Sequence, residues 1–497
     1  MQTIDLKPRP SLLMESLRSM GYRLETALAD VIDNSVAAGA RNISVRFLWA
    51  NAEPWIAILD DGHGMTQPEL IEAMRFGSRS PHARRADDDL GRFGLGMKTA
   101  SISQCRLLTV ISRVGGTLSA CSWDLEYLSR NESQDWEIFV HTNDTLLASP
   151  VIAPLLGTLA VWGTGTIVCW ENIDGMFPDK TAVRSEARFS DLMDGARTHL
   201  ELVFHRFLSP EPGHQSVRID FNGNSLKAFD PFGPKHPARQ ELTLEIIQIN
   251  GECVEVQPYV LPHHSKIPRS EYEAFGSEEG YLQSQGFYLY RNRRLIVKGT
   301  WFRLLRKEVL NKLIRVRVDI PNSLDALWRI DVKKAEADPP ETVLKELRKL
   351  VNRIAGMGQR VYTRRATRLA DGPLVSVWKR EIVEGKVRYS LNEDHPLLSE
   401  LLSDEDGTRA ARARACLRLV SNAFPSDVYF SDAASDSVEF GPPSDDASHL
   451  EVVARLIDAL RRCGFSGDEL REQVLKTEFP PISPESLEKL LVIPPHA

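Results

Sequence analysis

The segment Gly91–Ala100, GRFGLGMKTA, places three glycines directly before an apolar stretch of helical character. Glycines in front of a helix N-terminus form a loop whose backbone amides can surround phosphate oxygens, and the helix dipole favours the same negative charge. The segment does not fit the P-loop pattern, because Met97 separates Gly96 from Lys98, and it does not fit the dinucleotide pattern G-x-G-x-x-G. It predicts a phosphate-binding loop of another kind, and by itself it discriminates poorly among phosphate-binding proteins.

Polar residues interrupt the apolar helix that is predicted over residues 23–38. In the run Asp30–Ser35 (DVIDNS), Asp30 and Asn34 are four positions apart and therefore share one helix face. A carboxylate and an amide in this arrangement can orient a water molecule and bind a magnesium ion through oxygen. An exposed polar stripe on the helix is the alternative interpretation of this run taken alone.

The run Asp60–Met65 (DDGHGM) follows a strand that is predicted over Trp55–Leu59. The strand leads the carboxylate of Asp60 into a turn with two glycines, Gly62 and Gly64, which allow unusual backbone angles or the close approach of a ligand. A buried Asp at this place could accept a hydrogen bond from an exocyclic amine such as that of adenine. A plain Asp-Gly turn is the alternative.

The order of these three segments is more specific than any of them alone. They are followed by Gly163–Thr166 (GTGT) ahead of another predicted strand. Together they resemble the four signature motifs of the GHKL ATPases (gyrase, heat-shock chaperone, histidine kinase and MutL), over about residues 20–175. The run Phe76–Ser80 (FGSRS), with GRFGLGMKTAS after it, is similar to the pattern of the bacterial MORC- and MutL-like members.

This resemblance implies an ATP site to which all four motifs contribute. Asp60 would contact adenine, Thr166 would support that contact through a water molecule, and Gly77–Leu90 resembles the mobile lid that closes over ATP. The residues that the resemblance assigns to ATP are Asn34, Asp60, Gly62, Gly64, Met65, Gly91, Phe93, Gly94, Leu95, Gly96, Met97, Lys98, Thr99 and Thr166.

The implied catalytic residues include one departure from the family. In GHKL proteins a Glu four positions before the magnesium-binding Asn polarises the attacking water, whereas here Asn34 is preceded at that distance by Asp30. The shorter side chain changes the reach of the carboxylate by about 1–1.5 Å, which matters for catalysis, so we expect slow hydrolysis. A lysine of the following transducer domain reaches the γ-phosphate in the family, and Lys333 and Lys334 are the candidates; a solvated lysine pair is the alternative.

Length and patterning divide the chain into three regions, because 497 residues exceed the usual size of a single core. The patterning favours an α+β fold that begins with a two-layer sandwich over residues 1–185, and the resemblance implies that this sandwich is an ATP-binding domain of the Bergerat type. A transducer-like domain of ribosomal-protein-like α/β fold would follow over residues 186–340. A basic helix, a linker and a mainly helical C-terminal region would occupy residues 341–497. The hairpin expected at 287–297 resembles the strand pair of the transducer in MutL-like proteins and type II topoisomerases.

Positive charge is concentrated in one part of a chain whose formal net charge is −7. Residues 291–334 contain 13 Lys and Arg against four acidic residues, and the long helix predicted after Pro339-Pro340 adds more positive charge. This segregation indicates a groove for a nucleic-acid backbone over residues 291–368. A solvated basic face, paired with the acidic tail of the same chain, is the alternative.

Composition favours a cytoplasmic protein. No apolar run reaches the ~20 residues of a transmembrane helix, and the N-terminus lacks the pattern of a secretory signal. The six cysteines form no C-x-x-C pair, so neither a zinc site nor a disulfide framework is expected. No histidine precedes His63, which disfavours a histidine kinase with a phospho-accepting His ahead of its ATP domain.

The function that we expect is an ATP- and Mg²⁺-dependent clamp. ATP would bring two N-terminal domains together as a homodimer, and hydrolysis would reset it. By analogy with MORC- and MutL-like proteins, the client would be nucleic acid, and partner proteins of a repair, restriction or phage-defence system would take part. The alternative is a nucleotide-binding scaffold with little or no hydrolysis.

Overall fold

The structure of the protein is a computed structural model. This structure describes residues 8–19, 21–50, 53–77, 96–130, 135–174, 183–233, 236–237, 239–262, 268–276, 280–325, 327–328, 338–367, 375–383, 386–403, 407–423, 446–480 and 482–492. The chain forms two compact units. The first comprises residues 1–279, 283–307 and 312–354, and the second comprises 280–282, 308–311 and 355–497.

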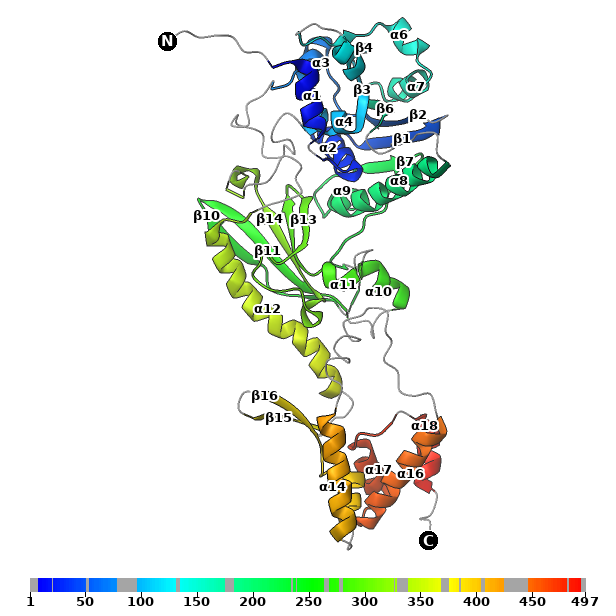
Figure 1. Ribbon diagram of the computed structural model, residues 1–497, viewed down its shortest axis with the longest axis vertical. Helices are drawn as coiled ribbons and strands as arrows, with labels where there is room; N and C mark the ends of the chain where they lie inside the picture. Colours follow the sequence, from blue (N-terminus) through cyan, green and yellow to red (C-terminus); the bar gives the residue numbers. More distant parts are fainter. Residues whose placement is uncertain are drawn as a thin grey trace. The chain divides into compact units, whose positions relative to one another are not determined.

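An eight-stranded sheet, antiparallel except for one pair, forms the first layer of unit 1 (Figure 1). Its strand order is β5-β4-β3-β6-β2-β1-β7-β8. The strands are β1 (Asn42–Ala50), β2 (Glu53–Asp60), β3 (Cys105–Val114), β4 (Thr117–Asp124), β5 (Phe139–Val140), β6 (Gly165–Ile173), β7 (Arg218–Phe221) and β8 (Asn224–Ser225). The strand predicted before the DDGHGM run is confirmed as β2, and its last residue is Asp60.

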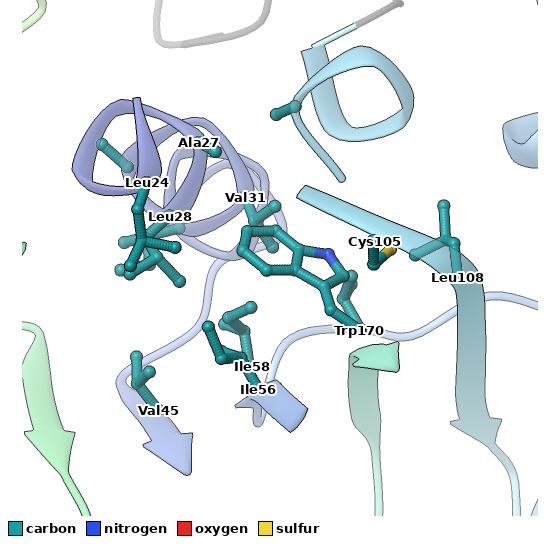
Figure 2. Packing of buried hydrophobic residues seen from close by; sticks show 14 of the residues in the cluster. Leu24, Ala27, Leu28, Val31, Val45, Ile56, Ile58, Cys105, Leu108 and Trp170 are labelled. Atoms are coloured by element: carbon teal, nitrogen blue, oxygen red, sulfur yellow. The ribbon is translucent and has the colours of Figure 1, made fainter. Parts of the chain in front are cut away.

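Helices cover one face of this sheet, as the sequence predicts. They are α1 (Pro10–Arg18), α2 (Leu24–Ala37), α3 (Gln67–Met74), α4 (Gly96–Gln104), α5 (Leu125–Arg130) and α8 (Val183–Val203). In Figure 2, Val31 of α2 lies beside the indole of Trp170, with Ile56 and Ile58 of β2 close by. The intervening residues of the same strands point to the opposite face, because side chains alternate along a strand.

The opposite face of the sheet is also covered, which the sequence did not predict. Ala57, Leu59, Ile167 and Cys169 form a second core with residues of α6 (Asn143–Ala148) and α7 (Ala153–Trp162). The near-continuous apolar runs of β2 and β6 follow from this burial on both sides. The central strands are therefore held rigidly at the point where β2 ends.

The first sheet is completed by a strand from beyond residue 185. β7 pairs in parallel with β1, with Asn42 opposite Arg218 and Val45 opposite Phe221. Helix α8 precedes β7 and packs on α2 through the core that Phe189, Met193 and Leu200 share with Leu28. A short helix, α9 (His205–Leu208), follows α8 directly.

A second sheet in unit 1 has the order β10-β11-β14-β12-β13, and β9 pairs with β11. Its strands are β9 (Gln240–Glu241), β10 (Glu245–Ile249), β11 (Glu252–Val260), β12 (Gly286–Arg291), β13 (Arg294–Thr300) and β14 (Ile314–Ile320). The predicted hairpin is confirmed as β12–β13, with Tyr290 opposite Leu295. Helices α10 (Arg269–Gly276) and α11 (Gly280–Gln283) and short 3-10 turns at Val309–Asn311 and Asn322–Leu324 lie in the connections. Helix α12 (Glu341–Thr367) packs on this sheet through Val343, Leu347, Leu350, Val351 and Ile354.

The end of α8 and helix α9 join the two sheets of unit 1. The imidazole Nε2 of His205 lies 2.8 Å from the hydroxyl of Tyr290 on β12. Burial, with the nearby positive charges of Arg206 and Arg317, lowers the pKa of His205 to about 3, so this imidazole is neutral at physiological pH. The guanidinium of Arg293 lies 4.8 Å from the ring centre of Phe207.

Unit 2 consists of a two-stranded hairpin and a group of helices. Beyond the end of α12, its described elements are β15 (Trp378–Val383), β16 (Lys386–Leu391), α13 (Pro396–Leu402), α14 (Gly407–Asn422), α16 (Asp446–Arg462), α17 (Gly467–Leu475) and α18 (Pro484–Val492). Val453, Leu456 and Leu460 of α16 pack against Leu470 and Val474 of α17. None of the helices in the described part of the chain has the length and apolarity needed to span a bilayer.

Candidate active site

The carboxylate of Asp60 lies at the end of β2 and is 5% exposed. Its Oδ2 accepts a hydrogen bond from the hydroxyl of Ser35 at 2.8 Å, and its Oδ1 accepts one from the backbone amide of Gly62 at 2.9 Å. Burial raises the pKa of Asp60, although the hydrogen bonds from Ser35, Gly62 and Thr166 oppose the rise. Asp60 is therefore a buried acceptor whose orientation is fixed by two hydrogen bonds.

The neighbouring Asp61 has a different role. Its Oδ1 accepts hydrogen bonds from the backbone amides of Arg41 and Asn42 at 2.7 and 2.9 Å, and its Oδ2 accepts one from Asn42 Nδ2 at 2.7 Å. These contacts fasten the turn after β2 to the start of β1. The two adjacent aspartates are thus divided between a buried acceptor and a structural tie. The contact of Asp60 with the Gly62 amide is that of an Asp-Gly turn, and the contact with Ser35 adds to it.

A chain of hydrogen bonds joins the turn after β2 to strand β6. Thr166 stands opposite Asp60 in the register of β2 and β6. The hydroxyl of Ser112, which is fully buried, accepts a hydrogen bond from the amide of Met65 at 2.7 Å and donates one to the carbonyl of Gly165 at 3.0 Å. The same hydroxyl lies 3.1 Å from Thr166 Oγ1.

Sequence reasoning missed two residues of this hydrogen-bond network, Ser35 and Ser112. Ser35 is the last residue of the DVIDNS run, and its position directly after the asparagine was the available signal. Ser112 follows the apolar residues Val110 and Ile111 in β3 at a fully buried position, and a polar residue at such a position was the signal there.

Two glycines are required by backbone geometry at this place. Gly64 has φ +69°, and a Cβ there would lie 2.4 Å from the carbonyl oxygen of Arg113. Gly165 has φ +139°, and a Cβ there would lie 1.9 Å from the carbonyl oxygen of Asp60. A side chain cannot be accommodated at either position without moving strand backbone, so the glycines hold β6 and the turn close to Asp60.

Asp30 and Asn34 lie on α2, one turn apart. Asp30 is 2% exposed, and its Oδ2 accepts a hydrogen bond from the hydroxyl of Tyr22 at 3.2 Å. The interpretation of this run as an exposed polar stripe is therefore wrong for Asp30, and Asp33 is also buried. Asn34 is exposed and donates from Nδ2 to the backbone carbonyl of Asp30 at 2.8 Å. This hydrogen bond fixes the orientation of the amide and leaves its oxygen as the end that can bind a ligand.

Asn34 offers one amide oxygen, which fits a magnesium ion whose other ligands come mainly from the substrate and from water. Among the residues that the structure describes, no group of three or more His, Cys, Asp or Glu side chains could hold a metal ion. Magnesium in nucleotide sites is commonly bound by one or two protein oxygens together with phosphates and waters. A single amide oxygen at Asn34 is consistent with that mode of binding.

Lys98 and Thr99 lie in the first turn of α4, next to the predicted phosphate loop. Lys98 is 3% exposed, and its Nζ donates to the carbonyls of Ala73 and Arg75 at 2.8 and 2.7 Å. These carbonyls belong to the end of α3, so Lys98 ties α3 to the start of α4. A contact of Lys98 or Thr99 with phosphate stays a prediction, as does one of Gly96 or Met97, which begin the same helix.

Several predicted residues lie outside the described part of the chain. They are Gly91, Phe93, Gly94 and Leu95 of the glycine loop, residues 78–90 of the segment that resembles a lid, and Lys333 and Lys334. The structure thus brings together Asp60, Gly62, Gly64, Met65 and Thr166, and it places Asp30 and Asn34 together on α2.

Comparison with known proteins finds a family and a relative that are similar to parts of this chain. Residues 22–147 match a family described as histidine kinase-, DNA gyrase B-, and HSP90-like ATPase. ATPase morc-1 of Caenorhabditis elegans is 32% identical over 95 residues, which is 19% of this chain and 11% of that protein. The chain therefore matches about a tenth of the length of this relative.

Proposed function

We propose that this chain binds ATP with Mg²⁺ and hydrolyses it slowly, because residues 22–147 match the histidine kinase-, DNA gyrase B-, and HSP90-like ATPase family and the chain is similar to a MORC ATPase. The observation that carries the proposal is the buried carboxylate of Asp60 at the end of β2, held by Ser35 and the amide of Gly62. These contacts join the first two motifs at a buried acceptor. The exocyclic amine of adenine is a donor that such a carboxylate would bind.

The chemistry proposed for the triphosphate uses the two residues on α2. Magnesium, when bound, would neutralise phosphate charge, and Asn34 would hold it through its amide oxygen. Asp30 would accept the proton of the attacking water, with its carboxylate oriented by the hydroxyl of Tyr22. Gly91, Gly94, Gly96 and the neighbouring residues of the loop would surround the phosphates, and Lys333 or Lys334 would reach the γ-phosphate.

Replacement of Asp60 tests the adenine contact. In Asp60→Asn we expect ATP affinity to fall roughly 10- to 100-fold, because a hydrogen bond to a charged acceptor contributes about 1.5–3 kcal/mol. The preference for ATP over GTP falls with it, since guanine presents a carbonyl where adenine presents its amine. Calorimetric titration of the full-length chain with each nucleotide measures both effects.

Asp61→Asn is the matched control for that measurement. An amide oxygen at this position can still accept from the backbone amides of Arg41 and Asn42, so the affinity should stay within about threefold. Wild-type affinity in Asp60→Asn would show that this carboxylate does not contact the base.

We further propose that ATP drives homodimerisation and that nucleic acid is the client, within a repair or defence system that includes partner proteins. Some of the basic residues counted in the sequence are buried, so the exposed basic surface is smaller than the charge count implies. Arg291 pairs with Asp325, and Arg294 pairs with Asp33, in both cases buried. Arg315 is also buried and donates to backbone carbonyls. The exposed positive side chains of the described part of 291–354 are Lys298, Arg303, Arg306, Lys307, Lys345, Arg348, Lys349 and Arg353.

The salt dependence of DNA binding tests this surface. In Arg303→Glu/Arg306→Glu we expect the slope of log K against log salt concentration to become less negative by roughly 1.8, because each lost phosphate contact removes about 0.9. Binding of a labelled duplex is measured at several salt concentrations. Arg130→Glu, an exposed arginine on α5, is the control and should leave the slope unchanged. An unchanged slope in the double variant would show that Arg303 and Arg306 do not contact DNA phosphates.

A further inference from the structure

Arg294, at the start of β13 in the second sheet, reaches the helix that carries Asp30 and Asn34. Its Nε donates to Oδ1 of Asp33 at 2.9 Å, and the two side chains are 4% and 1% exposed. Asp33 directly precedes Asn34 and lies one turn after Asp30 on α2. The ion pair therefore connects the site helix to a strand 261 positions later in the chain.

The surroundings hold Arg294 in this place. Its guanidinium lies 5.0 Å from the ring centre of Phe204, and its Nη1 donates to the carbonyl of Leu295. His199 on α8 does not compete as a cation, because burial and the positive charges of Arg294, Lys298 and Arg23 lower its pKa to about 3. Asp33 thus has a fixed, permanently charged partner from the second sheet.

The ion pair between Arg294 and Asp33 restrains rotation of α2 about its own axis. Leu28, Val31 and Ile32 attach one side of α2 to the first sheet through apolar contacts. Successive residues are separated by about 100° around a helix, so Asp33 attaches a different side of α2 to the second sheet. A small rotation of α2 would move Asp30 and Asn34 together, and it would also separate a buried charge from its partner, which is unfavourable.

We infer that Arg294 is a positioning residue for the nucleotide site: through Asp33 it fixes the rotation of α2, and so places the water-orienting Asp30 and the magnesium-binding Asn34. This inference rests on the proposed ATP chemistry. Because coupling between two sites is reciprocal, a nucleotide that shifts Asn34 also acts on β13. The second sheet is therefore connected to the site through described residues, independently of Lys333 and Lys334.

Steady-state kinetics of the full-length chain tests the inference. In Arg294→Met, we expect kcat for ATP to fall at least tenfold, while the Kd for ATP changes by less than threefold. Arg294→Lys retains the buried charge, so its kcat should be at least threefold higher than that of Arg294→Met. If Arg294→Met does not fold, Arg294→Lys alone serves, with kcat expected to be three- to tenfold below the wild-type value at unchanged Kd.

Arg291→Met is the matched control, because Arg291 also forms a buried ion pair, with Asp325, and this pair does not involve α2. It should lower the melting temperature and leave kcat within twofold. Values of kcat for the Arg294 variants equal to that of Arg291→Met would overturn the inference. Absence of ATP binding by the wild type would overturn the proposed function and this inference with it, whereas normal turnover in both Arg294 variants would overturn this inference alone.

Discussion

Asp30→Asn is expected to lower the rate of ATP hydrolysis by about two to four orders of magnitude, the usual contribution of a general base. The amide cannot accept a proton from water, yet its oxygen can still accept the hydrogen bond that Tyr22 donates to Asp30. The shape of the site should therefore persist, and the affinity for ATP should change by less than about threefold. Phosphate release under saturating ATP and calorimetric binding separate the two effects.

Glu25→Gln provides the control for Asp30→Asn. Glu25 lies on the same helix and pairs with the exposed Arg23, and we expect its neutralisation to leave turnover within about twofold. Turnover above a tenth of the wild-type rate in Asp30→Asn would remove the assignment of Asp30 as the base. Binding of ATP without phosphate release by the wild type, with and without DNA, would favour the nucleotide-binding scaffold.

Gly165→Ala is expected to abolish measurable ATP binding and to lower the free energy of unfolding by roughly 3 kcal/mol or more. The added Cβ would lie 1.9 Å from the carbonyl oxygen of Asp60, at a backbone φ of +139°. Relief of that overlap requires β6 to move away from β2, and this movement would separate Thr166 from Asp60. Nucleotide titration and urea denaturation of the full-length chain measure the two losses.

Gly163→Ala is the control within the same motif. Gly163 also has a positive φ, +82°, but an added Cβ there would meet nothing within 4 Å. Its substitution should cost about 1 kcal/mol of stability through backbone strain alone, and ATP affinity should stay within about threefold. Binding of ATP by Gly165→Ala with wild-type affinity would contradict the role given to the close contact of β6 and β2.

Local patterns predicted the elements of the first sheet well, because each depends on residues near in sequence. The apolar strand that ends at Asp60 and the amphipathic helix with Asp30 and Asn34 are read from periodicity and turn residues. The family match over residues 22–147 confirms the resemblance that the motif order indicated. The resemblance assigned the adenine contact to Asp60, whereas residue pattern alone does not show which of the two adjacent carboxylates is buried; in the structure it is Asp60.

Contacts between distant segments were not predictable from the sequence. The charge count over residues 291–334 treated Arg291, Arg294 and Arg315 as surface charge, although each is buried and satisfied by a partner far away in the chain. The cover of the far face by α6 and α7 was also missed, since a short apolar helix does not reveal which surface it packs on. Such pairings depend on topology, which single residues do not encode.

The parallel pairing of β7 with β1 has a consequence for biosynthesis. The two strands are joined by the hydrogen bond from Ser44 to Asp220, across 176 positions of sequence. During translation the edge of β1 therefore stays open until residues 218–221 have left the ribosome, and an open strand edge favours pairing with other chains. Contacts of such long range also slow folding. A fragment that ends near residue 185 would retain the motif residues and still carry this open edge permanently.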